Sequence, residues 1–297
     1  MFRIAVLQLP GVNCEYETAR ALAAAGLAAE VVRWTRHDLD EFDGFVLPGG
    51  FSFQDRVRAG AVAAREPALA AVVRAARDGR PVLGICNGAQ VLVEAGLVPD
   101  LHGEGRIEMG LAPNAMPGRQ GYYCTWVHTA PTARGRDSAF GLGLGPGEVI
   151  PVLAAHGEGR FVTRDPGVAA ALAAAEIVAF RYVAPDGGPA RGFPRNPNGS
   201  TADAAGIMNP AGNVLAFMPH PERAAWLFQV GWEVEGLWGD RHRAAVGDRA
   251  TLSGPGPGLR LFTSMRLYLE RRAAGAPATS AAKSRPAGAA TGKGASC

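Results

Sequence analysis

The stretch PVLGICNGAQ, residues 81–90, decides the fold of this chain. Its apolar run from Val82 to Ile85 stops at Cys86, and a helical pattern of apolar residues follows. This order predicts a buried strand, a tight turn at the cysteine and then a helix, with Gly84 and Gly88 admitting a strained turn that lifts the thiol clear of the sheet. The N–H groups that begin the helix would favour a thiolate, because they stabilise negative charge. Cys86 is therefore a candidate nucleophile, although this stretch alone also fits a small core cysteine at a strand end.

A second segment, LAFMPHPER at residues 215–223, supplies the partners that a nucleophilic cysteine needs. Prolines on both sides of His220 restrict the backbone to extended or turn conformations. His220 and Glu222 are two residues apart, so in an extended chain they leave on the same side and the carboxylate can orient the imidazole. Cys86, His220 and Glu222 thus form a candidate triad, whose members need to meet only in space. On its own, His220 would fit a loop histidine held between two prolines.

Strand and helix patterns alternate along the first part of the chain, which predicts an α/β fold. The strand patterns cover residues 2–7, 30–34, 44–47 and 81–85, and the helical patterns cover residues 15–25, 57–63 and 67–78. Such alternation implies βαβ units in a flavodoxin-like, open, mostly parallel sheet with helices on both faces. Ligand sites in these sheets lie at the carboxyl ends of strands, where Gly11, Gly49 and Gly50 also fall.

The second part of the chain predicts a strand-rich extension of this sheet. Residues 101–183 combine strand patterns with frequent glycines. Two later strands are expected at 177–183 and 214–218, and the second of them leads directly to His220.

Residues 1–272 are expected to form one domain that ends in an amphipathic helix at 259–272. Residues 273–297 are rich in Ala, Gly, Pro, Ser and Lys. They cannot bury enough apolar surface to fold and are predicted to form a disordered tail.

Composition and charge favour a cytoplasmic protein that binds neither membranes nor nucleic acids. Of the 297 residues 47% are hydrophobic, yet no run of 18 apolar residues occurs and the first residues lack the features of a signal peptide. A net charge of +3 with scattered arginines provides no basic patch for RNA or DNA. The four cysteines lack the spacing of a metal site or a disulfide framework, so we expect no metal and a reducing compartment.

Both deciding segments resemble those of the triad-type, class I glutamine amidotransferases. This similarity rests on GICNG at 84–88 and PHPE at 219–222. Further segments resemble the glutaminase subunit of phosphoribosylformylglycinamidine synthase, an enzyme of purine biosynthesis: LPGVNCE at 9–15, LPGGFSFQD at 47–55, AHGEGRF at 155–161 and NPNGS at 196–200. The resemblance covers about residues 2–223 and resumes near 259–269.

Residues 224–258 depart from the family pattern and are interpreted as an insertion. They contain Trp226, Trp232 and Trp238 with glycines and arginines between them. The insertion could contact a partner, but we favour a surface loop that buries its own aromatic side chains, because exposed aromatic patches are uncommon.

The resemblance implies that the chain hydrolyses glutamine to glutamate and ammonia through a thioester on Cys86. His220 would pass a proton to the leaving ammonia and then activate water, while Glu222 would hold the imidazole tautomer. The oxyanion needs backbone donors, for which the amides of Asn87 and Gly50 are candidates. Gly50 could alternatively serve only a tight turn.

Several other positions keep two interpretations. Gln90 could contact glutamine, or it could be a capping or solvated residue. Gly49, His156 and Glu158 could shape substrate binding or coupling to a partner, and a structural role in a loop fits His156 and Glu158 equally well. One histidine with one carboxylate is too few ligands for a closed metal site.

Cys14 and Cys124 are rivals for the nucleophile. Cys14 follows Gly11 near a strand end but lacks a glycine on each side and a strand-to-helix turn. Cys124 lies in a strand pattern and is predicted to be a packing residue.

By resemblance, the ammonia passes to a large synthetase subunit that uses ATP and Mg²⁺ to amidate formylglycinamide ribonucleotide, often with a small third subunit. This chain has no Gly-x-x-x-x-Gly-Lys-Ser/Thr loop, so we expect no cofactor in it. We expect low activity of the free chain and activation on assembly, because an uncoupled site would lose ammonia.

Two other functions stay open at this point. One is a triad amidotransferase that feeds another ammonia acceptor, against which the Asn-Cys-Glu and His-Gly-Glu-Gly segments argue. The other is a stress-related hydrolase, a deglycase or a non-catalytic regulatory subunit of similar fold, none of which requires a His-Pro-Glu segment after a late strand.

Overall fold

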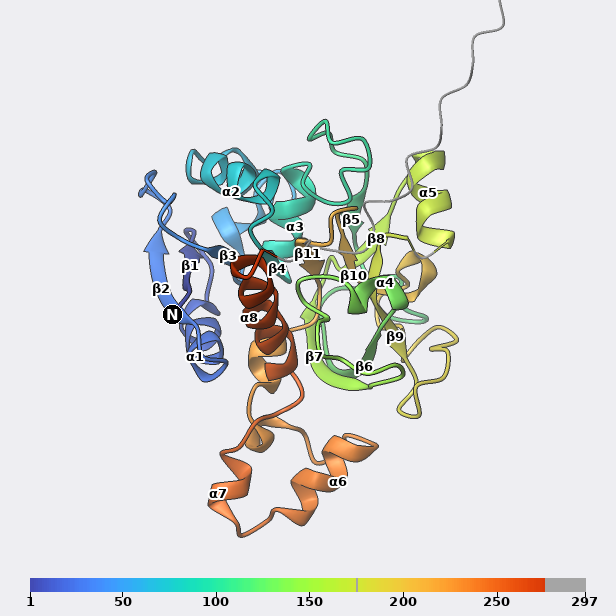
Figure 1. Ribbon diagram of the computed structural model, residues 1–297. Coiled ribbons are helices and arrows are strands. Elements are labelled where there is room, and N and C mark those ends of the chain that lie inside the picture. The colour runs from blue at the N-terminus through green and yellow to red at the C-terminus, as the bar shows by residue number, and fades with distance from the viewer. Residues whose placement is uncertain (175, 276–297) are drawn as a thin grey trace, which may run out of the picture.

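The computed structural model describes residues 1–174 and 176–275, and its centre is a nine-stranded sheet (Figure 1). The strands of this sheet are β1 (Arg3–Gln8), β2 (Ala28–Arg33), β3 (Gly44–Leu47), β4 (Val82–Ile85), β6 (Tyr123–Pro131), β7 (Ile150–His156), β9 (Val178–Val183), β10 (Ala204–Met208) and β11 (Val214–Phe217). Their order in space is β2-β1-β3-β4-β11-β10-β9-β6-β7. A separate pair joins β5 (Gly110–Ala112) to β8 (Arg160–Val162).

The direction of the strands divides the sheet into two halves. Strands β2, β1, β3, β4 and β11 run parallel to one another, whereas β10, β9, β6 and β7 continue the sheet with antiparallel pairs. The predicted α/β class, with an open and largely parallel sheet and a strand-rich extension, is confirmed. Strand β10 was not predicted, because its sequence AAGIM has one β-branched residue, Ile207, and no aromatic residue to favour a strand.

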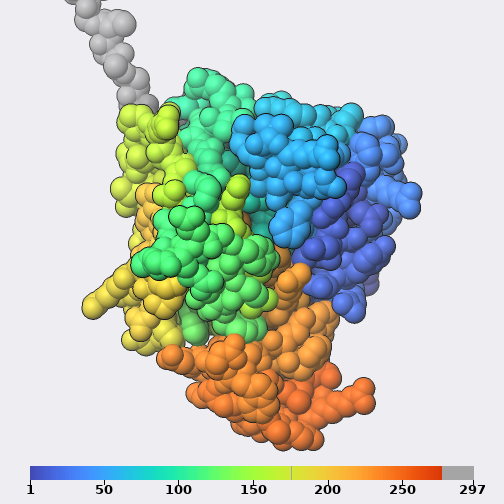
Figure 2. Space-filling model, turned by 180° about the vertical axis from the view of Figure 1, so that it is seen from behind, coloured from blue at the N-terminus to red at the C-terminus, as the bar shows by residue number. Residues whose placement is uncertain are grey.

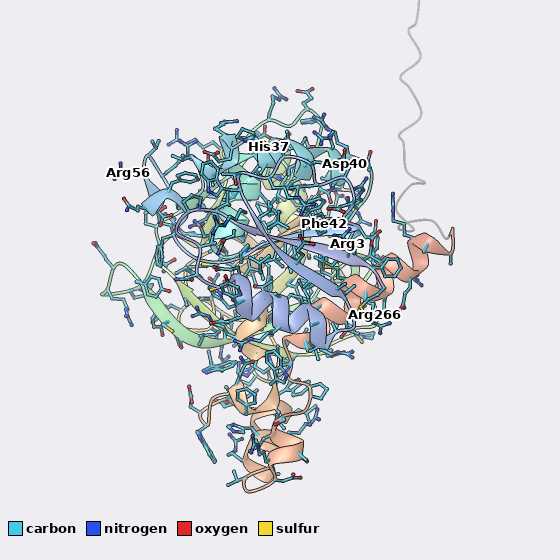
Figure 3. All side chains as sticks on the ribbon, turned by 90° about the vertical axis from the view of Figure 1, so that its left-hand side faces the viewer. Arg3, His37, Asp40, Phe42, Arg56 and Arg266 are labelled. Carbon is cyan, nitrogen blue, oxygen red and sulfur yellow. The ribbon has the colours of Figure 1, made fainter. Side chains whose placement is uncertain are left out.

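Helices cover both faces of the parallel half. The α-helices are α1 (Glu15–Ala24), α2 (Ala68–Arg77), α3 (Asn87–Glu94), α4 (Ala133–Arg136), α5 (Pro166–Ala173), α6 (Leu237–Ala244), α7 (Arg249–Leu252) and α8 (Leu259–Ala273). Short 3₁₀ turns are η1 (Ser52–Asp55), η2 (Ala63–Arg65), η3 (Thr201–Asp203), η4 (Pro221–Ala224) and η5 (Leu227–Gln229). Helices α1 and α8 pack together on one face, and α2 and α3 lie on the other (Figures 1 and 3).

The helix predicted at 57–63 is wrong. That stretch forms turns and reaches only the short helix η2 at its end. Gly60 adopts a φ of +80°, and a Cβ there would lie 2.6 Å from the backbone of Gln90. A left-handed residue pressed against a neighbouring helix interrupts any regular helix at this point.

One large cluster of buried apolar side chains extends from Ile4 to Leu269 and surrounds the sheet. Helix α8 closes this cluster with Leu261, Phe262 and Met265, all fully buried. The helix continues to Ala273, one residue beyond its predicted end, and residues 276–297 of the predicted tail lie outside the described residues. No helix in the described part of the chain has the length and apolar character that crossing a membrane requires.

The segment predicted to be an insertion, residues 224–258, projects from the body as a lobe with its own small core (Figure 2). That core consists of Leu227, Val230, Val234 and Ala245, with Trp126, Trp238 and Leu252 packed against it. Trp226 and Trp238 are partly buried, as expected. Trp232 remains 60% exposed, so the prediction that the loop buries its own aromatic side chains is wrong for Trp232. Phe228 of the same segment is also 55% exposed.

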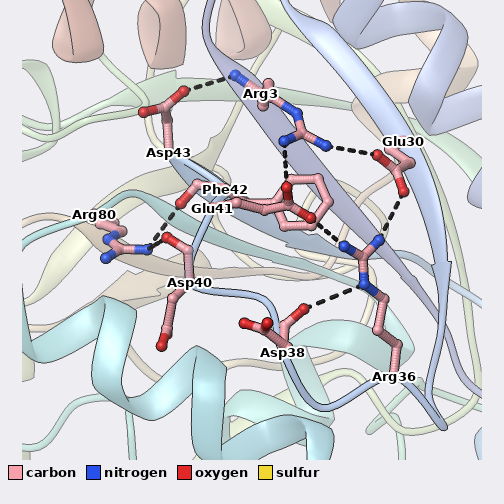
Figure 4. A network of polar contacts seen from close by, with 9 residues as sticks. All are labelled: Arg3, Glu30, Arg36, Asp38, Asp40, Glu41, Phe42, Asp43 and Arg80. Carbon is pink, nitrogen blue, oxygen red and sulfur yellow. Dashed lines mark hydrogen bonds and ion pairs between the residues drawn. The ribbon is translucent and has the colours of Figure 1, made fainter.

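A network of ion pairs covers strand β2 at one edge of the sheet (Figure 4). Arg3 pairs with Glu30 at 3.1 Å and with Glu41 at 2.5 Å, while Arg36 pairs with the same two carboxylates. Both guanidinium groups also lie over the ring of Phe42. These contacts fix the loop between β2 and β3 onto the edge strand.

Candidate active site

Cys86 occupies a strained turn between β4 and α3. Its backbone has φ 50° and ψ −106°, values that residues other than glycine rarely adopt, and it is the N-cap of α3. Parallel pairing places Ile85 opposite Phe217 of β11, and the Cys86 N–H donates to the Phe217 carbonyl at 2.9 Å. The predicted elbow, with the thiol at the carboxyl edge of the sheet, is confirmed.

Two glycines allow this turn because the chain passes closer than a side chain permits. A Cβ at Gly84 would lie 2.5 Å from the Gly88 carbonyl oxygen, and one at Gly88 would lie 1.9 Å from the Leu47 carbonyl oxygen. Real Cβ atoms essentially never approach that closely, so the helix must move away from the sheet if either glycine is replaced.

Gly88→Ala is therefore expected to lower the free energy of unfolding by about 3 kcal/mol or more, measured by urea denaturation of the free chain. The matched control is Gly110→Ala, since a Cβ at Gly110 meets nothing within 4 Å. We expect the control to change stability by less than about 0.5 kcal/mol. Equal stability of Gly88→Ala and wild type would contradict the close approach.

Strand β7 brings His220 and Cys86 to the same place. The His220 N–H donates to the Leu153 carbonyl at 2.8 Å, and the Cys86 thiol donates to the Ala155 carbonyl, with an Sγ–O distance of 3.6 Å. Leu153 and Ala155 are two residues apart on one strand, so their carbonyls point to the same side. The backbone of β7 thus holds the two residues side by side, although they are 134 positions apart in sequence.

Glu222 orients the ring of His220. Its Oε1 lies 2.5 Å from His220 Nδ1, with His220 3% exposed and Glu222 fully buried. Burial disfavours the imidazolium, but the charges of Glu222 and Cys86 outweigh it and raise the pKa of His220 well above its ordinary value. Because Nδ1 is engaged by the carboxylate, Nε2 is the ring nitrogen left for the thiol.

Cys14 and Arg223 lie next to the imidazole, on the side of Nδ1. Cys14 Sγ is 4.0 Å from His220 Nδ1 and accepts a hydrogen bond from Arg223 Nη2 at 3.1 Å. Burial opposes the charge of Arg223, but Cys14, Glu222 and Glu17 together raise its pKa. Cys14, His220 and Glu222 place potential metal-ligand atoms within 4.8 Å of one another, but the guanidinium already supplies a positive charge at that position.

A cavity of about 200 Å³ opens in front of Cys86 and His220. Of the residues predicted for the site, Gly50, Cys86, Gln90, His156, Glu158 and His220 line it. Gly49 and Glu222 do not line the cavity but contact the ring of His220. A Cβ at Gly49 would lie 2.6 Å from Cε1 of His220. The sequence reasoning missed other residues of the lining: Asn13, Phe51, Asp55, Tyr122, Ala155, Gly157 and Arg223.

Asn87 and Gln90 belong to a buried hydrogen-bond network at one wall of the cavity. The Asn87 side chain accepts from the Ser52 N–H at 3.0 Å and donates to Gln90 Oε1 at 2.9 Å. Gln90 Nε2 in turn donates to the Glu158 carbonyl at 2.8 Å. Gln90 is only 6% exposed, so the alternative of a solvated residue is wrong.

His156, which also lines the cavity, is held in place by Asn114. Its Nδ1 and the Gly159 N–H both reach Asn114 Oδ1 at 3.1 Å, and Asn114 Nδ2 donates to the His156 carbonyl at 2.8 Å. Burial first, and then the His220 charge, lower the pKa of His156 to about 3, so its ring stays neutral. Its Nε2 is buried and has no partner among the described residues.

Two predicted family segments meet beside this histidine. Asn198 donates to the Gly159 carbonyl at 2.8 Å, and the Phe161 N–H donates to Ser200 Oγ at 3.1 Å. The NPNGS segment therefore braces the loop that carries His156 and Glu158.

The rival cysteines occupy different positions. Cys14 is 1% exposed and does not line the cavity. Cys124 lies on β6, as predicted, but its side chain is exposed, so the expected packing role is wrong.

Gly50 lines the cavity with a φ of +148°, and a Cβ there would lie 2.4 Å from Val12 Cα.

Comparisons with known proteins identify relatives over most of the chain. A family model described as a CobB/CobQ-like glutamine amidotransferase domain matches residues 1–269. Phosphoribosylformylglycinamidine synthase subunit PurQ of Methanothrix thermoacetophila is 42% identical over 277 residues, which cover 91% of this chain and 99% of that relative. The PurQ subunit of Symbiobacterium thermophilum is 43% identical over 223 residues, which cover 75% of this chain and 88% of the relative.

A solved structure gives the same result at the level of the fold. A chain of the PurLQS structure from Thermotoga maritima is 30% identical, with a TM-score of 0.66. The match covers 90% of this chain and 99% of that chain.

Proposed function

Because this chain belongs to the PurQ subunits of phosphoribosylformylglycinamidine synthase, within the glutamine amidotransferase family, we propose that it is the glutaminase of such a synthase. It hydrolyses glutamine and supplies the ammonia to a PurL-type synthetase subunit. That subunit converts formylglycinamide ribonucleotide to formylglycinamidine ribonucleotide in purine biosynthesis. The observation that carries this function is the placement of Cys86 and His220 at one cavity, with Glu222 bonded to the ring of His220, in a chain that covers 99% of a PurQ relative.

The first half of the reaction forms a thioester. The Cys86 thiolate attacks the side-chain amide carbon of glutamine, and the electron pair of the carbonyl moves onto oxygen. The backbone N–H groups of Asn87 and Gly50 stabilise this oxyanion, the former as an unpaired donor of the first turn of α3. Collapse of the tetrahedral intermediate breaks the C–N bond, and the His220 imidazolium gives its proton to the departing nitrogen, so that ammonia leaves.

The second half regenerates the thiol. Neutral His220 takes a proton from water, the resulting hydroxide attacks the thioester, and glutamate departs as the C–S bond breaks. Glu222 holds the Nδ1–H of the ring throughout, which fixes the tautomer that presents Nε2 to the thiol.

The partners follow from the relatives. The PurLQS structure from Thermotoga maritima contains a chain like this one, and its name indicates PurL and PurS subunits as partners. The chain assembles with a large PurL-type and a small PurS-type subunit. We assign ATP and Mg²⁺ to the large subunit and no cofactor to this chain, because this sequence lacks a phosphate-binding Gly-Lys-Ser/Thr loop.

We also place the protein in the cytoplasm. A reducing compartment keeps a nucleophilic thiol available, and Cys14, Cys86 and Cys124 are all free. Neither a nucleic acid nor a membrane is assigned as a partner.

Assembly should control the activity of this site. The free chain is expected to hydrolyse glutamine at least about 10-fold more slowly than the complex with PurL- and PurS-type subunits, ATP, Mg²⁺ and formylglycinamide ribonucleotide. The measurement is glutamate release from the free chain and from the complex at equal chain concentration, together with formation of the amidated ribonucleotide. Equal rates would contradict control by assembly, and a complex that uses ammonium salt but never glutamine would contradict the proposed function.

A further inference from the structure

The segment after strand β3, residues 50–60, begins with the Gly50 amide, which is one of the two donors assigned to the oxyanion. The short turn η1 lies within this segment. A donor stabilises the transition state fully only if its position is fixed before the reaction begins. The contacts that fix this segment therefore affect the rate at which the thioester forms.

The backbone of this segment is strained. Phe53, Gln54 and Asp55 have φ values of 52°, 59° and 53°, and Val57 has a φ of 72°. Left-handed backbone is unfavourable for a residue with a Cβ, and most of all for a β-branched residue such as Val57. The side chain of Val57 is 87% exposed, so packing does not hold it there. Such a conformation persists only where surrounding contacts impose it.

Helix α3, which begins directly after the nucleophile, supplies these contacts. In its first turn, Asn87 Oδ1 accepts from the Ser52 N–H at 3.0 Å. In its last turn, Glu94 binds Arg58, and between these two contacts Gly60 lies against the backbone of the helix. Asn87 and Glu94 are seven residues apart, which is two turns, so both face the segment from the same side of the helix.

The contact between Arg58 and Glu94 is bidentate. Nε and Nη2 of Arg58 lie 2.6 Å and 2.5 Å from the two carboxylate oxygens of Glu94. The Glu94 side chain is only 8% exposed and lies at the C-terminal end of α3, where the helix dipole disfavours a negative charge. Arg58 is 55% exposed, but two parallel hydrogen bonds to a buried carboxylate fix its position better than an ordinary surface ion pair would.

We propose that Arg58 and Glu94 are positioning residues for the glutaminase reaction, because their ion pair holds the strained segment so that the Gly50 amide stays directed at the oxyanion formed on Cys86. This assignment rests on the proposed glutaminase function. Neither Arg58 nor Glu94 is among the residues that line the cavity, so the pair acts through the segment and not on the substrate. Without the pair, the left-handed residues would relax and the amide would move with them.

The test compares Arg58→Gln, Glu94→Gln and the double variant in the assembled synthase. Each single change is expected to lower glutamine-driven kcat about 30-fold, which is less than the loss of about 10²- to 10³-fold when an oxyanion donor is removed outright. The KM for glutamine should change by less than about 3-fold, because the pair does not touch the substrate. The double variant should be no slower than the slower single variant, since both changes break one interaction. Losses that multiply in the double variant would contradict the proposal.

Two further variants serve as controls. Arg56→Gln removes an exposed arginine of the same segment, whose guanidinium bonds to Gln54, and should leave kcat within about 2-fold of wild type. Arg58→Lys keeps the charge but not the paired hydrogen bonds, so it should recover kcat to within about 5-fold of wild type. Amidation driven by ammonium salt should be unchanged in every variant, which checks that the complex assembles. Equal losses of kcat in Arg56→Gln and Arg58→Gln would overturn the proposal.

Alkylation of Cys86 by iodoacetamide separates oxyanion stabilisation from damage to the thiol. The thiolate displaces iodide from a saturated carbon, so a C–S bond forms and no oxyanion arises. The alkylation rate, followed by mass spectrometry of the peptide that contains Cys86, should stay within about 2-fold of wild type in Arg58→Gln and Glu94→Gln. If alkylation slows as much as glutamine hydrolysis, the pair supports the thiol or the fold instead, and the proposal is wrong.

Failure of this proposal and failure of the proposed function give different results. An assembled wild type that never uses glutamine overturns the glutaminase, whatever the variants do. A wild type that uses glutamine, with Arg58→Gln and Glu94→Gln equally active, overturns the positioning role and leaves the glutaminase in place.

Discussion

Cys86→Ala is expected to lower glutamine-driven amidation by the assembled synthase about 10⁴-fold or more, while amidation driven by ammonium salt continues. The thiol is the atom that forms the thioester, and no other side chain of the cavity can replace it. The variant keeps the elbow, since alanine and cysteine meet similar strain at a φ of 50°. The measurement is formation of the amidated ribonucleotide with each nitrogen source.

The matched control is Cys124→Ala. Cys124 is free and exposed on β6, outside the cavity, so its replacement should leave both nitrogen sources equally effective. If Cys124→Ala removes the glutamine-driven reaction and Cys86→Ala does not, the nucleophile assigned here is wrong. Loss of both reactions in Cys86→Ala would indicate failed assembly instead, which sedimentation of the complex would detect.

Glu222→Gln is expected to lower glutamine-driven kcat by about 10³-fold with little loss of stability. The glutamine amide is similar in size but neutral, so the 2.5 Å contact to His220 Nδ1 loses its charge and no longer enforces one tautomer. The neighbouring Glu17→Gln, which removes a partly exposed carboxylate that contacts Arg223 but not His220, should change the rate by less than about 3-fold.

The same variant should alter the pH dependence in a definite direction. Glu222 is the leading cause that raises the pKa of His220, so its replacement should lower that pKa and move the loss of the imidazolium to lower pH. The alkaline limb of the plot of kcat/KM against pH should therefore move to lower pH in Glu222→Gln and stay in place in Glu17→Gln. Because the cysteine and the histidine titrate together, the profile reports the pair and not either residue alone. An unshifted limb would mean that Glu222 does not set the charge of His220.

The parts of the site that could be predicted from the sequence are those fixed by local chain geometry. An apolar run that ends at Gly-Ile-Cys-Asn-Gly specifies a strand, a turn and a helix within ten residues. His220 and Glu222 likewise follow one strand at a spacing that places them on one side. The parallel half of the sheet was predictable for the same reason, since strands and helices alternate there.

What could not be predicted depends on contacts between distant segments. Asp55 lies in the segment LPGGFSFQD, and only the fold shows that it lines the Cys86 cavity. Asn114 carries no local pattern at all, yet it fixes His156 through two hydrogen bonds and accepts a third from the Gly159 N–H. The burial of Gln90 follows in the same way from its contact with Glu158, 68 residues away.

The ion-pair network over strand β2 has a consequence for how copies of this protein behave at high concentration. Strand β2 is an edge of the sheet, and an edge offers unpaired backbone groups on which a strand of another molecule can add. Exposed ion pairs such as Arg3 with Glu41 add little to folding stability. An incoming strand would nevertheless have to strip water from these charges, so the network protects the edge against aggregation more than it strengthens the fold.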